Sequence, residues 1–305
     1  MVRPAPLRSV LLAATLFVGA SAPAALAQTT VNTVPVSLTA PAETSSYSVD
    51  YRPIGVFTEA FGDQERGRTK IAYAALEQQG KRFLTRYVDY LAGVPVSSLD
   101  RDDQLAFWLN TRNILIVQAM AESNSRRRMQ RARGTAEAPG SMWTEKRISF
   151  GDTELSIEDI EKDIILANWS DTPNVIFGLY QGTQGGAGLP AEGFRGETVH
   201  AELAATGKTF INARSGVRAR RNSVEIPELF YWYNDAFFGG DEAAMTAHLA
   251  TLAEGDRAEA LTSGRQTKAR KFSYRSDELI IRQQSVPTAG GAGGFAGGGG
   301  AGGGS

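Results

Sequence analysis

One stretch constrains this chain more than any other: Gln104–Val117, with the sequence QLAFWLNTRNILIV. Three carboxylates stand just before it, where they suit the positive end of a helix dipole: Asp100, Asp102 and Asp103. Apolar residues recur at helical spacing on more than one face, which predicts a helix buried in the interior. Asn110 then lies inside the core, and Asn113 lies close to the same face. Because a buried amide without partners costs about 1–3 kcal/mol, other segments must supply hydrogen bonds to both side chains.

Length and composition exclude several classes of protein. The chain has 305 residues and 42% hydrophobic content, enough for a sizeable core in one large or two small domains. A formal net charge of -1 gives no bulk attraction to nucleic acid, and we expect no nucleic-acid partner. The absence of Cys excludes disulfides, a thiol nucleophile and Cys-based metal sites, and two His residues do not favour a His-rich site. We therefore expect no metal and no cofactor.

The N-terminal residues predict export. Two arginines among the first eight residues precede an apolar run over residues 10–20, and Ala25-Leu26-Ala27 matches a small-residue cleavage signal. We interpret residues 1–27 as a secretory signal peptide. The apolar run is too short for a typical membrane span, and no later stretch approaches about 18 consecutive apolar residues. With no Cys to carry a lipid, these features predict a bacterial protein of the periplasm or extracellular space, without a transmembrane anchor.

Composition divides the mature chain into three parts. Residues 28–50 are rich in Thr, Ser, Pro and Val and predict an extended linker, whereas residues 285–305 are mostly Gly and predict a disordered tail. Between them, residues 51–284 predict a single α+β domain, mostly helical, with a small and largely antiparallel sheet.

Local signals place several elements in this domain. Gly151-Asp152 suits the turn of a hairpin over residues 147–155, and Ser156 with Asp159 forms a capping-box-like pair that begins the next helix. Residues 174–180 are an apolar run that predicts a buried strand. Further helices are expected over 198–210, from Pro227, over 241–253 and over 257–261, with short strands over 224–226 and 270–281.

Two other stretches invite a functional interpretation. The Gly-rich residues 181–190 follow the predicted strand, but they lack the Lys-Ser/Thr of a phosphate loop, so nucleotide binding is not favoured. Arginines crowd residues 126–133, and an anion-binding loop would use Arg126, Arg127 and Arg128. The alternative is a solvated surface insertion, and neither net charge nor flanking residues argue against it.

Several motifs, taken in order, resemble the domain-of-unknown-function 547 family. Ala106-Phe107-Trp108-Leu109-Asn110, followed by Asn113, resembles the family signature Ala-Phe-Trp-Ile-Asn with its second Asn. Leu155–Glu161 (LSIEDIE) resembles its Leu-Ser-Leu-Asp-Asp-Ile-Glu, and Phe177-Gly178-Leu179 resembles its strand before a Cys-rich turn. Phe230–Phe237 (FYWYNDAF) resembles its Phe-x-Trp-Tyr-x-x-Asp-Phe. The ordered set covers about residues 67–281.

The departures from this family fall on residues suited to catalysis. Lys162 stands where the family usually has His, and Gln181 and Gly186 stand where it usually has Cys. A Cys, a His and an Asn amide are the parts of a thiol hydrolase: nucleophile, base and orienting group. Gln and Gly cannot attack a carbonyl, and Lys162 can act as a base only if burial lowers its pKa by several units.

Three interpretations fit these residues. The first is a non-catalytic exported domain that binds an unknown small molecule or peptide in a hydrolase-like pocket. Its candidate lining residues are Asn110, Asn113, Glu161, Lys162 and Gln181. The second is a hydrolase that uses Glu161 with Lys162 or His200, although a lone His is more often a surface or packing residue. The third is a purely structural or interaction domain, in which the asparagines and Glu161 satisfy each other and buried backbone.

Overall fold

The predicted central helix is α3, Arg101–Glu122, in the computed structural model. Asp100 is its N-cap, and the carboxylate accepts hydrogen bonds from the backbone N–H groups of Asp102 and Asp103 at 3.1 and 3.0 Å. Every residue from 104 to 117 is buried, as the all-round apolar pattern predicts. The structure describes residues 34–279 apart from 66–67, 77, 124–125 and 136–137. The predicted signal peptide and the Gly-rich tail therefore lie outside the described residues.

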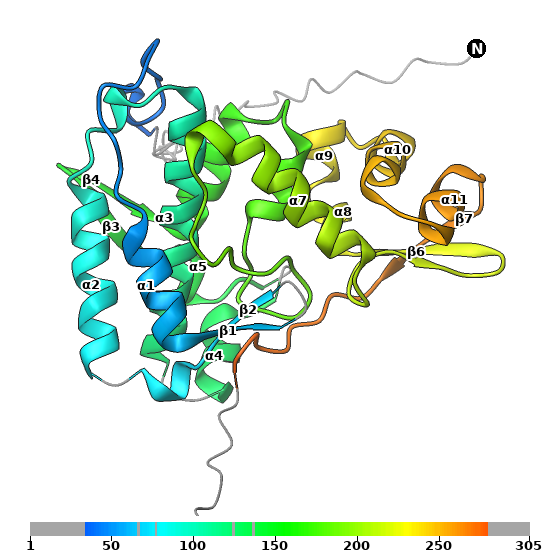
Figure 1. The fold of residues 1–305 in the computed structure, drawn as a ribbon, viewed down its shortest axis with the longest axis horizontal. Coiled ribbons are helices and arrows are strands. Elements are labelled where there is room, and N and C mark those ends of the chain that lie inside the picture. The colour runs from blue at the N-terminus through cyan, green and yellow to red at the C-terminus, as the bar shows by residue number, and fades with distance from the viewer. Residues whose placement is uncertain (1–33, 66–67, 77, 124–125, 136–137, 280–305) are drawn as a thin grey trace, which may run out of the picture. The chain divides into compact units, whose positions relative to one another are not determined.

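Other helices surround α3. It contacts α2 (Gln78–Ala92), α7 (Val199–Asn212) and the segment that begins with α6 (Ile157–Asp159), and Figure 1 shows α2 beside it. The remaining α-helices are α1 Arg52–Phe61, α4 Arg126–Arg133, α5 Ser141–Thr144, α8 Leu229–Trp232, α9 Asn234–Phe238, α10 Glu242–Leu252 and α11 Asp256–Thr262. Short 3₁₀ turns lie at Val36–Leu38, Tyr73–Ala75, Val96–Ser98 and Gly196–Thr198. No helix among the described residues has both the length and the apolar character needed to cross a bilayer.

The strands form three small sheets. Antiparallel pairs join β1 (Gly62–Glu65) to β2 (Arg68–Ile71) and β3 (Lys146–Phe150) to β4 (Thr153–Ser156). The third sheet has the order β5-β6-β7, where β5 is Arg218–Ala219, β6 is Ser223–Pro227 and β7 is Gln266–Arg270. β5 pairs antiparallel with β6, whereas β6 and β7 are parallel. The mostly helical α+β class is confirmed, with its antiparallel pairs divided among separate sheets and one parallel pair added.

Local turn and cap signals are confirmed around β3 and β4. Gly151 has φ of 59° in the hairpin turn, a conformation that glycine adopts without steric penalty. Ser156 and Asp159 form the complete capping box: the Asp159 backbone N–H donates to Ser156 Oγ at 3.1 Å, and the Ser156 backbone N–H donates to Asp159 Oδ2 at 2.6 Å. These signals work because each depends on residues within one turn of chain.

Two predicted strands are wrong. Residues 174–180 lie mainly in a 3₁₀ helix, Pro173–Gly178, because a short buried apolar run does not distinguish strand from helix and Pro173 suits the first helical position. β7 ends at Arg270, and residues 271–279, called the C-terminal strap here, make only isolated bridges such as Thr183↔Ser276 and Ile71↔Glu278. Figure 1 shows this orange segment running from β7 to the β1–β2 hairpin.

The described part of the predicted linker, residues 34–50, packs on the helical core. Leu38 is buried, and its carbonyl accepts a hydrogen bond from Trp108 Nε1 at 3.2 Å. Gln104 Nε2 donates to the carbonyl of Ala40 at 3.0 Å. Both donors come from the buried face of α3, so the core itself binds a segment whose composition resembles that of a free linker.

Candidate functional site

The two signature asparagines of α3 hold different segments. Asn110 Nδ2 donates to the Phe194 carbonyl and Asn110 Oδ1 accepts from the Phe194 backbone N–H, both at 2.8 Å. Asn113 Nδ2 donates to the Gly178 carbonyl at 2.9 Å, and its Oδ1 accepts from the Tyr180 backbone N–H at 3.2 Å. Both side chains therefore position backbone, as the structural interpretation predicts.

Arg112, between the two asparagines, is a fully buried charged group of α3. Its side chain is fully buried, with Nε donating to Glu161 Oε2 at 2.8 Å and Nη2 donating to the same oxygen. Its Nη1 donates to the Tyr180 carbonyl at 2.8 Å and to Asn113 Oδ1 at 3.2 Å. Each of the three guanidinium nitrogens of Arg112 thus has a hydrogen-bond partner, as a buried guanidinium requires.

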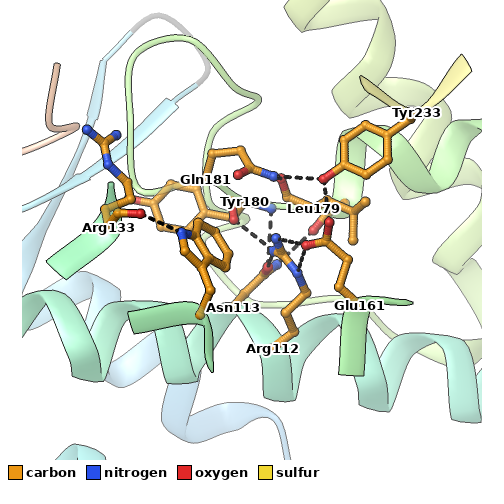
Figure 2. Close-up of polar contacts among 10 residues, drawn as sticks. Arg112, Asn113, Arg133, Glu161, Leu179, Tyr180, Gln181 and Tyr233 are labelled. Atoms are coloured by element: carbon orange, nitrogen blue, oxygen red, sulfur yellow. Dashed lines mark hydrogen bonds and ion pairs between the residues drawn. The ribbon is translucent and has the colours of Figure 1, made fainter. Parts of the chain in front are cut away.

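Glu161 continues this network toward Gln181. Glu161 Oε1 accepts from the Tyr233 hydroxyl at 2.7 Å, and that hydroxyl accepts from Gln181 Nε2 at 3.2 Å. Burial and the Glu161 charge raise the pKa of Tyr233 well above its usual range, so the phenol stays protonated and donates. Figure 2 shows the contacts running from Arg112 through Glu161 and Tyr233 to Gln181.

The backbone that carries Glu161 has an unusual form. After the capping box and α6, the chain continues as a π-helix over Ile160–Leu166. Such turns, with i→i+5 hydrogen bonds, are rare and are often found at functional sites. Glu161, Lys162 and Leu166 of this segment all line one pocket.

This pocket has a volume of about 280 Å³. Five of its lining residues are aromatic: Trp143, Trp232, Tyr233, Phe272 and Tyr274. The ring centroids of Trp232 and Phe272 lie 4.6 Å apart, and those of Phe272 and Tyr274 lie 4.9 Å apart. Two strap residues, Phe272 and Tyr274, thus join Trp232 in what we call the aromatic wall of the pocket. We call the part of the lining that includes Glu161 and Gln181 the floor.

Three of the five candidate pocket residues line this pocket: Glu161, Lys162 and Gln181. Asn113 lies behind it, bonded to the segment that leads to Gln181, and Asn110 holds a different loop. Lys162 is mostly exposed, and its ion pair with Glu158 raises its pKa, the opposite of the shift that a neutral base requires.

His200 does not join the pocket. It is exposed, and its Nε2 lies 2.9 Å from Asp102 Oδ1 at the start of α3. It is absent from the lining residues. The hydrolase interpretation thus has no histidine beside Glu161.

The two positions at which the family usually has Cys lie in contact here. A Cβ built on Gly186 would stand 3.1 Å from the Cβ of Gln181 and 3.0 Å from its Cγ. The Gln181 side chain, which donates to the Leu179 carbonyl at 3.2 Å, thus occupies the space beside Gly186. A larger residue at 186 requires Gln181 to move.

The arginine-rich stretch is helical, not a loop. Arg127 and Arg128 of α4 are exposed, and the side chain of Arg126 lies outside the described residues. Arg133, at the end of the same helix, is only 5% exposed and lines the pocket. Its carbonyl accepts a hydrogen bond from Trp143 Nε1 at 2.9 Å.

The pattern of the sequence did not single out Trp143, Phe272 or Arg133 as site residues. Trp143 stands alone in a polar stretch and Phe272 in the predicted final strand, so neither carries a periodic signal. The available signal was a large aromatic residue in a polar segment, which needs a partner surface. In the part of the chain that the structure describes, no cluster of His, Asp or Glu side chains is suited to hold a metal ion.

Comparison with known proteins gives a family without an assigned function. Residues 96–211 match the model of a family described as "Protein of unknown function, DUF547". No curated protein and no solved structure matches the chain. The matched residues include α3, the π-helical segment and Gln181, whereas the aromatic wall from Trp232 to Tyr274 lies beyond them.

Proposed function

We propose that this chain, which belongs to the DUF547 family, is a non-catalytic binding protein whose aromatic pocket takes up a small molecule. The observation that carries this proposal is the state of Glu161, one of the two carboxylates among the described lining residues; the other, Glu158, pairs with Lys162. Both of its oxygens accept hydrogen bonds, from Arg112 and from Tyr233. A general acid or base must exchange a proton with substrate, and this carboxylate instead holds two protein segments together.

The lining supports recognition of a flat apolar group. Aromatic side chains contribute large apolar surfaces and stack on planar partners. The volume of about 280 Å³ stands near the lower end of ligand pockets, roughly 300–1,000 Å³, which favours a small molecule over a peptide. A few polar groups, including Gln181 and Lys162, would orient that molecule.

The test is a ligand screen with a matched pair of variants. Flat aromatic fragments are titrated into the mature protein and binding is followed by tryptophan fluorescence and by NMR. Trp232→Ala removes part of the wall, whereas Tyr231→Ala changes the neighbouring half-buried residue of α8, which does not line the pocket. We expect bound fragments to lose at least about tenfold in affinity with Trp232→Ala and little with Tyr231→Ala.

Two results would contradict the proposal. One is a screen in which no fragment binds the wild-type protein. The other is turnover of an ester, amide or glycoside that Glu161→Gln abolishes, because a carboxylate with a purely structural role takes part in no catalytic step.

We further propose that the protein is exported. The support is the N-terminal pattern of two arginines, the apolar residues 10–20 and Ala25-Leu26-Ala27. Fractionation of bacterial cells expressing the full chain, with N-terminal sequencing, tests this. Export predicts a mature chain that begins at Gln28; an uncleaved chain in the cytoplasm would exclude it.

A further inference from the structure

Arg133 is a buried cation without a carboxylate partner among the described residues. Its Nη2 donates to the Tyr274 carbonyl, and its guanidinium carbon lies 5.2 Å from the centroid of the Tyr274 ring. Its Nη1 is buried and has no hydrogen-bond partner in the part of the chain that the structure describes. Burial lowers the pKa of Arg133 to about 10, so the group remains charged at neutral pH. A buried charge without a counter-charge is costly, and a ligand of opposite charge would remove that cost.

The other charges at the pocket are already paired. Arg112 neutralises Glu161 from behind the floor, and Lys162 forms an ion pair with Glu158 at the rim. Three cations therefore meet two carboxylates, and Arg133 is the one left in excess. With Arg112 counted from behind the floor, the described charged groups at the pocket therefore carry an excess of one positive charge, in a site where low polarity strengthens electrostatic interactions.

The same geometry disfavours a cationic ligand. An aromatic box can bind an ammonium group over its ring faces. Here Arg112 already lies over the ring of Trp143, at 5.6 Å, and Arg133 lies over that of Tyr274. A further cation would meet two occupied rings and an excess positive charge.

We propose that the ligand of this pocket is a small aromatic carboxylate whose anionic group lies beside Arg133. This inference rests on the proposed binding function and specifies its ligand class. The aromatic wall stacks on the flat part of the ligand, and the carboxylate supplies the counter-charge that Arg133 lacks. A carboxylate fits better than a phosphate monoester, which brings a charge of about −1.5 to −2 to a site with one cation in excess.

The first test uses three probes of one shape on the wild-type protein. Naphthalene-2-carboxylate, 2-naphthamide and 2-naphthylmethylamine present an anion, a neutral amide and a cation on the same ring system. We expect the carboxylate to bind at least about tenfold more tightly than the amide, and the amine to bind weakest, in calorimetry at pH 7 and low salt. This series does not depend on the folding of any variant.

The second test removes the charge. Arg133→Gln should bring the affinities for carboxylate and amide within about twofold of each other, and Arg133→Lys should retain part of the preference. Arg131→Gln, on the exposed part of the same helix, is the matched control and should leave the wild-type order unchanged.

The outcomes separate this inference from the proposed function. Equal affinities for all three probes, each lost with Trp232→Ala, would overturn the carboxylate proposal and leave the binding pocket intact. Tighter binding of the amine would overturn it as well. If no probe binds at millimolar concentration, the carboxylate proposal fails, and the broader fragment screen decides the binding function by itself.

Discussion

Arg112 and Arg133 are two buried arginines at one pocket, yet their surroundings differ. Each lies over the ring of an aromatic lining residue, Trp143 for Arg112 and Tyr274 for Arg133. Arg112 donates to the Glu161 carboxylate and a backbone carbonyl. Arg133 donates to a backbone carbonyl, and its Nη1 has no partner among the described residues. Burial of a charge therefore does not define its role. A buried arginine that has a counter-charge stabilises the fold, whereas a buried arginine that has none is available to a ligand.

Arg112→Met should show the largest effect. It leaves the Glu161 carboxylate without its cation and the Tyr180 carbonyl without its donor, which should lower the free energy of unfolding by about 3–5 kcal/mol. Urea unfolding followed by circular dichroism measures this. The double variant with Glu161→Gln should recover part of the loss, because the unpaired charge is then gone. A stability of the Arg112→Met variant within 1 kcal/mol of wild type would show that Arg112 does not hold the fold.

Asn110→Ala should come next, with a loss of about 2–3 kcal/mol. Both backbone groups of Phe194 lose their buried partner, and the truncated side chain leaves a small void. Because Asn110 does not line the pocket, affinity for any pocket ligand should stay within about twofold of wild type. Thermal unfolding and calorimetry on the same sample check both statements. Loss of affinity without loss of stability would show that Asn110 belongs to the binding site.

Asp159→Ala should cost about 1 kcal/mol at pH 7, because it removes the capping box that begins the Glu161 segment. Hydrogen bonds from Lys146 and Ser156 outweigh burial and lower the pKa of Asp159. A depressed pKa stabilises the fold above the unfolded value of about 4 and loses that effect as the pH falls through the folded value. The difference between variant and wild type should therefore shrink below about pH 4 in unfolding measured against pH. Glu154→Ala, an exposed residue of β4, is the control.

Arg133→Met should have the smallest effect on stability, within about 1 kcal/mol of wild type or slightly stabilising. Removing an uncompensated buried charge offsets the lost contact with Tyr274. Parallel urea titrations of Arg133→Met and Arg112→Met compare the two free energies of unfolding directly. A loss of 3 kcal/mol or more would place Arg133 with Arg112 as a residue that holds the fold.

The sequence predicted those features that depend on neighbouring residues. The buried helix α3, the hairpin at Gly151 and the capping box of Ser156 each follow from a local pattern, and each is confirmed. The prediction of a strand over residues 174–180 is wrong, because a short apolar run indicates burial but has no periodicity that distinguishes a strand from a helix.

The sequence predicted only the part of the candidate site that lies within or beside local motifs. Glu161, Lys162 and Gln181 lie within or beside family motifs, so resemblance located them. The aromatic wall and Arg133 come from segments distant in the sequence, and no local pattern shows that they meet. Arg112 did carry a signal, a charge in the middle of a buried helix, which requires a buried counter-charge.

The route of the C-terminal strap has a consequence for the order of folding. Phe272 and Tyr274 complete the pocket wall, and Asp277 and Leu279 donate backbone N–H groups to Gly182 and Ile71, far earlier in the chain. Such non-local contacts form late, because the entropy cost of closing the loop between their partners is offset only after the intervening chain has ordered. The floor can assemble once Tyr233 is in place, while the pocket stays open until the strap, about forty residues further along the chain, has docked. A ligand of this site can therefore be enclosed only after the strap has docked.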